Sequence, residues 1–220
     1  MAAGPETQSA MGLPVREFAA GLAAKQPTPG GGSAAALAGA LGAALVSMVC
    51  QYTVGREQYA DVDEDLRRVL ERSEALRGEL EQAVEDDVAA YGSYSRAQSM
   101  PKEGEAERAA RAEALQAALR ESTEVPLGVA ERCVEVLELA LEAAEKGNRY
   151  LISDAAVGAE LAAAGRASAE LNVRLNAGGI EDASFARSAD ERLAALASRA
   201  PGRELAERVT RVVEERTSAS

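Results

Sequence analysis

The stretch Pro27-Thr28-Pro29-Gly30-Gly31-Gly32-Ser33-Ala34-Ala35-Ala36 lies in the longest part of the chain without a charged residue, which runs from Gln26 to Gly55. Its prolines and glycines predict a tight turn, after which Ser33 is expected to cap a helix over about residues 33–54. A helix start presents free N–H groups and a positive dipole end, so it can hold an anion or a polar ligand group. A loop and cap without a ligand fit the same residues equally well.

The composition favours closely packed helices. Hydrophobic residues make up 47% of the 220 residues, yet only 3% are aromatic, so the apolar content is mostly Ala, Leu and Val. Small side chains bury little area each, and helices that carry them must approach closely and share large surfaces. Ala35, Gly39 and Ala43 recur at a spacing of four, which predicts a face for close helix packing.

Helical periodicity continues through the rest of the chain. It predicts helices over about residues 61–98, 115–125, 129–144, 155–175 and 188–216. Pro126 marks a kink or a new helix start, and Pro201-Gly202 is a candidate break in the last helix. No stretch combines β-branched alternation with hairpin turns. The prediction is an all-α fold, namely an antiparallel helical bundle with a long uncharged central helix. The bundle is expected to be homodimeric. Residues 13–220 are expected to form a single domain after a disordered tail, residues 1–12.

Charge and residue usage exclude several classes of function. The net charge is -12 and no basic run with aromatics is present, which argues against a nucleic acid partner. The chain has no His, so an imidazole base is excluded and a metal site is not expected. Cys50 and Cys133 lie in apolar helical patterns. We expect both to be buried thiols in a reducing compartment. With no signal peptide and no membrane partner expected, the predicted localisation is cytoplasmic.

Three groups of polar residues are candidates for chemistry. Asp87 and Tyr91 are one turn apart on the inner face of their helix, where a carboxylate can act as a general acid or base. The alternative is that both residues lie on a solvent-exposed helix surface without a catalytic role. Asp154 fits a helix cap or a pocket carboxylate. Asn172, Arg174 and Asn176 fall within little more than one helical turn, either to bind a polar heterocycle or as an exposed helix end.

Taken in order, these pieces resemble the formimidoyltetrahydrofolate cyclodeaminase / methenyltetrahydrofolate cyclohydrolase family, from about Phe18 to Phe185. Their order and spacing together are specific. The matching segments are Pro29-Gly30-Gly31-Gly32-Ser33 with its Ala-rich helix, Asp87-x-x-Ala90-Tyr91, Pro101-Lys102, Val125-Pro126-Leu127, Gly147-Asn148, Ser153-Asp154 and Asn172-Val173-Arg174-Leu175-Asn176.

The resemblance implies an all-helical homodimer with tetrahydrofolate, as the substrate carrier, in a cleft near the glycine turn. It places the catalytic aspartate on Asp87. Arg56, Lys102 or Arg174 would meet the glutamate carboxylates of folate, which offsets the negative charge of the chain. The other expected substrate contacts are Gly30, Gly31, Gly32, Ser33, Tyr91, Asn148, Asp154, Asn172 and Asn176.

Two reactions follow from the resemblance. One closes a 5-formimino group onto N10 and releases ammonia, and the other interconverts 5,10-methenyl- and 10-formyltetrahydrofolate. Both pass through a tetrahedral carbon between two nitrogens and need proton transfer, with no metal or redox cofactor. The chain departs from the family pattern at two places. It has Gly55-Arg56 where the family often has Gly-Lys, and Arg149-Tyr150 where the family often has a Pro and a small polar residue. A tetrahydrofolate-binding protein without activity and a helical scaffold are the alternatives.

Overall fold

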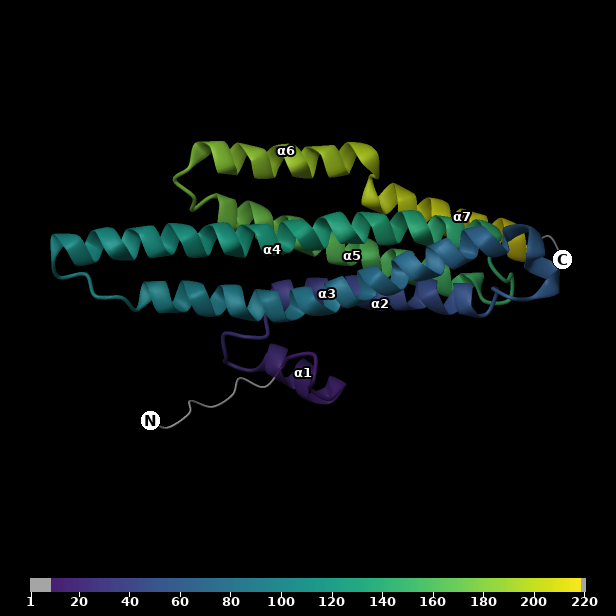
Figure 1. The fold of residues 1–220 in the computed structure, drawn as a ribbon, viewed down its shortest axis with the longest axis horizontal. Helices are drawn as coiled ribbons and strands as arrows, with labels where there is room; N and C mark the ends of the chain where they lie inside the picture. The colour runs from purple at the N-terminus through teal and green to yellow at the C-terminus, as the bar shows by residue number, and fades with distance from the viewer. Residues whose placement is uncertain (1–8, 219–220) are drawn as a thin grey trace.

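The computed structural model describes residues 9–218, and all regular elements in that part of the chain are helical, which confirms the all-α prediction. Figure 1 shows α2 to α5 aligned along the long axis, with α6 and α7 along one side and α1 projecting from the other. The elements are α1 (Val15–Ala23), α2 (Gly31–Gln51), a 3₁₀ helix η1 (Glu57–Val62), α3 (Asp63–Gln98), α4 (Glu105–Lys146), α5 (Ile152–Ala177), α6 (Ala183–Arg199) and α7 (Gly202–Ser218).

Helix α2 packs against α3, α4 and α5. Small residues let it lie very close to α5: a Cβ built on Gly42 would come within 2.7 Å of the carbonyl oxygen of Gly158, and one built on Gly158 within 2.9 Å of that of Gly42. The two backbones therefore touch at this crossing. The predicted small-residue face meets α5 as well, since a Cβ built on Gly165 would come within 2.8 Å of the carbonyl oxygen of Ala35 and 3.1 Å of the N of Gly39. Among residues 9–218, α2 is the one helix whose length and apolarity would suffice to cross a membrane, and most of it is buried in the bundle.

Gly42→Ala tests this contact. We expect it to lower the free energy of unfolding by about 1–3 kcal/mol, because the added methyl group forces α2 and α5 apart. Gly78→Ala is the matched control, since a Cβ at Gly78 in α3 meets no atom within 4 Å; it should stabilise the helix by about 0.5–1 kcal/mol. Urea unfolding measures both. An equal response of the two variants would contradict the close crossing.

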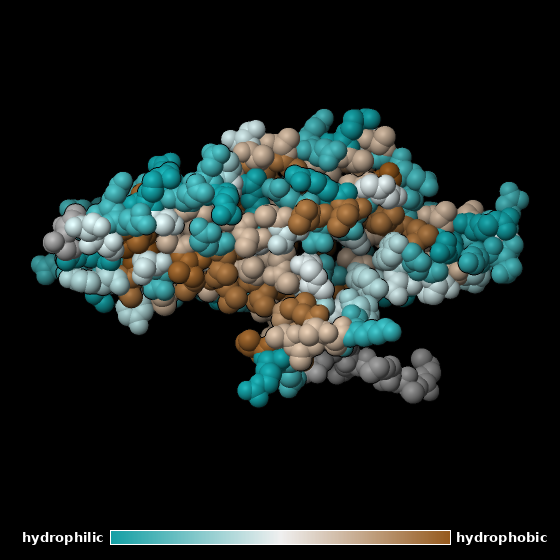
Figure 2. Space-filling model, turned by 180° about the vertical axis from the view of Figure 1, so that it is seen from behind, coloured by the Kyte–Doolittle hydropathy of each residue, from teal (hydrophilic) through white to brown (hydrophobic). Residues whose placement is uncertain are grey.

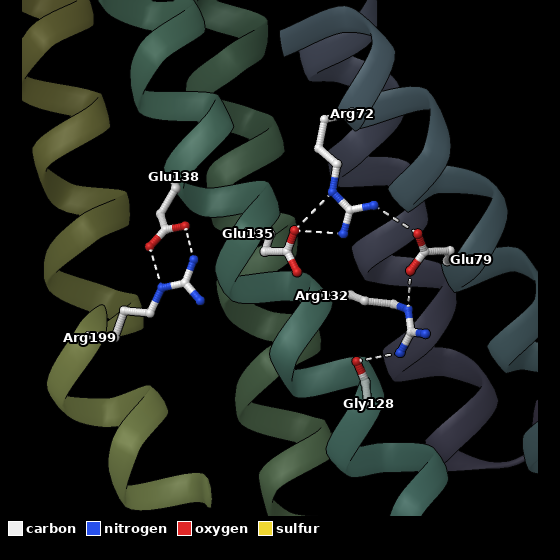
Figure 3. Close-up of polar contacts among 7 residues, drawn as sticks. All are labelled: Arg72, Glu79, Gly128, Arg132, Glu135, Glu138 and Arg199. Atoms are coloured by element: carbon white, nitrogen blue, oxygen red, sulfur yellow. Dashed lines mark hydrogen bonds and ion pairs between the residues drawn. The ribbon is translucent and has the colours of Figure 1, made fainter. Parts of the chain in front are cut away.

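Charged residues join α3 and α4 on the outside of the bundle (Figure 3). Arg72 bridges Glu135 at 2.6 Å and Glu79 at 2.8 Å, and Arg132 binds the other oxygen of Glu79 at 2.7 Å. The side chains are about a third exposed, so each pair contributes about 0.2–1 kcal/mol at most. Their alternation nevertheless favours one register of α3 against α4.

Two helix starts differ from the predictions. Helix α2 begins at Gly31 with Gly30 as its N-cap, so the expectation that Ser33 caps it is wrong. Helix α5 begins at Ile152 after Leu151, which places Asp154 in its first turn rather than at the cap. In α2 the residue that binds the free N–H group comes from another helix, which local sequence does not reveal.

Helix α4 runs without interruption through Pro126, so the predicted separate helices over residues 115–125 and 129–144 are one element. A proline inside a helix leaves the carbonyl four residues earlier without its N–H donor. That carbonyl belongs to Ser122, and the side-chain Nδ2 of Asn176 donates to it at 2.5 Å. Tertiary contact with α5 thus satisfies the group that the proline leaves unpaired.

The predicted tail, residues 1–12, lies partly outside the described residues. Its described part, residues 9–12, forms a turn rather than a disordered segment. Glu85 of α3 holds this turn, since its Oε1 accepts hydrogen bonds from Ser9 Oγ at 2.6 Å and from Met11 N at 2.8 Å. Burial raises the pKa of Glu85, but these hydrogen bonds outweigh it and leave the pKa below its usual value.

Candidate active site

A cavity of about 530 Å³ opens where the turn before α2 meets α3, α4 and the end of α5. Its size suits a small organic ligand. Its walls come from segments more than a hundred residues apart in sequence. The lining residues are Pro27, Thr28, Gly30, Gly31, Gly32, Asp87, Ala90, Tyr91, Tyr94, Leu119, Ser122, Pro126, Asn172, Leu175, Asn176 and Gly179.

Asp87 is held at the N-terminus of α2. Its Oδ2 accepts hydrogen bonds from the backbone N of Ser33 at 2.8 Å and from the Ser33 hydroxyl at 2.6 Å. Ser33 is fully buried and Asp87 is half-buried, so these bonds are partly shielded from water. Within residues 9–218 the second oxygen, Oδ1, accepts no hydrogen bond, and Asp87 lines the cavity. One carboxylate oxygen is therefore fixed and the other is available to a ligand.

The glycine turn allows this approach. A Cβ built on Gly32 would overlap the carboxylate of Asp87, so only glycine fits at this position. The N–H groups of Gly31 and Gly32 belong to the first turn of α2, where no helical partner exists. They line the cavity and form no hydrogen bond with another described residue. They can donate to a polar ligand group beside Asp87.

The remaining walls combine flat apolar surfaces with two amides. Tyr91 and Tyr94 stand on α3 along the direction that leads away from Asp87. The same cavity is lined by Asn172 and Asn176 on α5, whose Nδ2 groups donate to the backbone carbonyls of Ser168 and Ser122. Their amide oxygens accept no hydrogen bond from another residue within 9–218, so they can accept one from a ligand. This mixture suits a flat heterocycle with N–H groups at its edge.

The structure brings together seven of the predicted site residues in this cavity and places Ser33 directly behind them. The seven are Gly30, Gly31, Gly32, Asp87, Tyr91, Asn172 and Asn176.

Three other predicted residues lie at the opposite end of α2. Arg56 and Asn148 follow the C-terminal ends of α2 and α4, and Asp154 is in the first turn of α5. The 21 residues of α2 separate them from the glycine turn by about 30 Å. Asn148 has a structural role there, since its N donates to Thr53 Oγ1 at 2.9 Å and its Oδ1 accepts from Tyr59 at 3.3 Å. Within one copy of the chain, these three residues do not line the cavity.

Lys102 and Arg174 also lie outside this cavity. Arg174 points away and pairs with Glu170 at 3.4 Å. Lys102 follows α3 and lines a separate, neighbouring cavity.

Sequence reasoning missed Tyr94 and Ser122. Tyr94 falls seven residues after Asp87 on the same helix face, a spacing that could have identified it. Ser122 had no such signal, because its importance depends on Pro126 and on the fold.

The buried thiols do not form part of the site. Burial raises the pKa of Cys133 to about 12, and burial together with Glu142 raises that of Cys50 to about 12. Both stay protonated at neutral pH, so neither is a nucleophile. Among the described residues, no group of three or more His, Cys, Asp or Glu side chains is arranged to hold a metal ion.

Known proteins resemble this chain over most of its length. The chain is 50% identical to methenyltetrahydrofolate cyclohydrolase of Methylorubrum extorquens over 83% of this chain and 86% of the relative. It is 37% identical to formimidoyltransferase-cyclodeaminase of Mus musculus, over 88% of this chain and 36% of the relative's length. The structure of formiminotetrahydrofolate cyclodeaminase from Thermotoga maritima superposes with a TM-score of 0.81, at 30% identity, over 92% of this chain and 96% of that one.

The match to the family described as formiminotransferase-cyclodeaminase covers residues 14–195. It includes the glycine turn, Asp87 and both asparagines of the cavity. The chain spans about a third of the length of the mouse relative, so it corresponds to one part of that protein. The fold, the cavity and this match together show that the chain belongs to the formiminotransferase-cyclodeaminase family.

Proposed function

We propose that this protein is a methenyltetrahydrofolate cyclohydrolase with Asp87 as its proton shuttle. One observation carries the proposal: Asp87 lines a ligand-sized cavity, with one carboxylate oxygen fixed by Ser33 and the other without a hydrogen bond from a described residue. The 50% identity to a relative of that name favours the hydrolytic reaction over the deaminating one. The substrate is a tetrahydrofolate derivative, bound with its pterin between the tyrosines and the asparagines.

The chemistry requires one group that accepts and returns a proton. A water molecule adds to the carbon between N5 and N10, and Oδ1 of Asp87 takes its proton. The bond from the tetrahedral carbon to N5 then breaks as its hydroxyl oxygen forms the carbonyl and loses its proton to water, while Asp87 returns the first proton to N5. The product is 10-formyltetrahydrofolate, with net release of one proton. The N–H groups of Gly31 and Gly32 would stabilise oxygen on the tetrahedral carbon.

Cyclodeaminase activity is the second candidate. The Thermotoga maritima relative carries that name, and its fold covers nearly the whole of this chain. In that reaction Asp87 would transfer a proton to the amine that leaves as ammonia. The same carboxylate and the same cavity serve both reactions, so the geometry alone supports either.

The absorbance of 5,10-methenyltetrahydrofolate distinguishes these functions. We expect the purified protein to accelerate its loss when the methenyl compound is supplied in water. Growth of the same signal from 5-formiminotetrahydrofolate, with release of ammonia, would establish the cyclodeaminase instead. Binding of tetrahydrofolate without either reaction would leave a binding protein, and absence of binding would overturn the proposal.

We also propose that two copies associate through α2 and α5. Leu41 on α2 and Val157, Leu171 and Leu175 on α5 are about half to three-quarters exposed. Figure 2 shows hydrophobic side chains gathered on the face opposite to that of Figure 1. Exposed apolar surface of this kind typically marks an interface. Because Leu175 also lines the cavity, a second copy would help to enclose the substrate; analytical ultracentrifugation tests the association.

A further inference from the structure

Pro126 lies inside α4 and lines the cavity beside Asp87. A proline in the interior of a helix is unfavourable, because it removes a backbone hydrogen bond and its ring collides with the carbonyl group four residues earlier. Helix α4 nevertheless continues on both sides of Pro126, which is buried. The position of this residue in the cavity wall points to a role in the site rather than in the helix.

The carbonyl group of Ser122 is the one that Pro126 releases. In an uninterrupted helix the N–H of residue 126 would donate to this oxygen, and a proline has no N–H. The oxygen instead accepts a hydrogen bond from Nδ2 of Asn176 on α5, at 2.5 Å. An alanine at position 126 would draw the same oxygen back into the backbone hydrogen bonds of α4. Asn176 therefore has this partner because residue 126 is a proline.

The hydrogen bond to Ser122 decides which way round the amide of Asn176 lies. A carbonyl oxygen only accepts hydrogen bonds, so the amide turns its NH₂ group toward it. The amide oxygen accepts no hydrogen bond from another residue within 9–218, and Asn176 lines the cavity. Asn172, one turn earlier on α5, is arranged alike, since its Nδ2 donates to the carbonyl of Ser168 at 3.2 Å. Two neighbouring amides thus keep their oxygens for a ligand.

We propose that Pro126 is a positioning residue, which fixes the amide of Asn176 so that its oxygen accepts a hydrogen bond from the amino group of the bound pterin. This inference rests on the proposed function, because it takes tetrahydrofolate as the ligand. An amide that could turn over would present its NH₂ group as readily as its oxygen, and two donors do not bind each other. A fixed oxygen instead disfavours a ring without the amino group, because the acceptor is then left without a partner.

The test is a double-mutant cycle on the decay of methenyltetrahydrofolate. Pro126→Ala should raise KM by about three- to tenfold and leave kcat within about twofold, because only binding is weakened. Asn176→Ala should raise KM by about tenfold. The double variant should be no worse than Asn176→Ala alone, because Pro126 acts through that amide. Losses in KM that multiply would show that Pro126 contacts the substrate directly, and they overturn the inference.

Pro201→Ala is the matched control. It makes the same change at an exposed proline just before α7 that does not line the cavity, so KM should stay at the wild-type value. Thermal unfolding checks each variant. Alanine is a better helix former than proline, so α4 is expected to stay folded in Pro126→Ala. If KM for Pro126→Ala equalled that of wild type, Pro126 would have no role in positioning.

Binding of tetrahydrofolate and of its 2-desamino analogue, measured by calorimetry, tests the role of the amino group without turnover. We expect wild type to bind the amino form about tenfold more tightly, which corresponds to about 1.4 kcal/mol. This preference should fall to about threefold or less in Pro126→Ala and in Asn176→Ala. The same preference in all three proteins, or binding of neither compound, overturns the inference. If this pattern appears but the methenyl compound is not hydrolysed, the proposed function fails and the inference stands.

Discussion

Replacing Asp87 with asparagine is expected to lower kcat for methenyltetrahydrofolate hydrolysis by about a hundredfold or more, with the fold intact. The amide oxygen of asparagine can accept the hydrogen bonds that Ser33 now donates at 2.8 and 2.6 Å, so the start of α2 keeps its partner. The amide NH₂ group then takes the place of Oδ1 at the cavity. It cannot accept a proton from water, so the shuttle is lost. Decay of the methenyl absorbance measures the rate, and thermal unfolding checks the fold.

Asp86→Asn supplies the control. Asp86 is the preceding residue on α3, but it is exposed and accepts a hydrogen bond from Gln82 at 3.0 Å. Its replacement removes the same charge from the same helix, and we expect turnover within about twofold of wild type. If Asp87→Asn retained turnover within about threefold of wild type, Asp87 would have no part in proton transfer and the proposed mechanism would fall.

The fold was largely predictable because its helices carry a strong period and few competing signals. Ala35 and Gly39, two residues of the predicted small-residue face of α2, lie close against Gly165 of α5. Two predictions failed, and in both places a residue distant in the sequence supplies a hydrogen-bond partner that local sequence does not reveal. Ser33 was expected to act as a cap, yet its N–H is bound by Asp87, 54 residues later. Pro126 predicted an interruption, yet Asn176 from α5 binds the carbonyl that the proline leaves free.

The candidate site was predictable in part. Asp87, Tyr91 and the two asparagines were identified from their helical spacing and their place in an ordered set of motifs. Such a set does not separate residues that touch a ligand from residues that hold the fold. Within one copy of the chain, Asn148 lies at the far end of α2, where it forms hydrogen bonds with Thr53 and Tyr59.

Gly32→Ala is expected to lower kcat/KM by about a hundredfold or more, without removing any functional group. The added methyl group would occupy the position of the Asp87 carboxylate, which must then leave its hydrogen bonds to Ser33. Movement of a catalytic group by about 1 Å is enough for losses of this size. Steady-state rates with the methenyl compound measure the effect, and thermal unfolding shows whether the start of α2 survives.

Gly31→Ala provides the comparison for Gly32→Ala, since a Cβ at Gly31 meets no atom within 4 Å. We expect its loss of kcat/KM to be at least about tenfold smaller, although both substitutions make the same chemical change in the same turn. The double variant Gly32→Ala with Asp87→Asn should be no slower than the slower single variant. Groups that act as one unit are strongly non-additive, because the second change removes a contribution that the first has already abolished. Losses that multiply would instead show that Gly32 acts independently of Asp87, through the substrate itself.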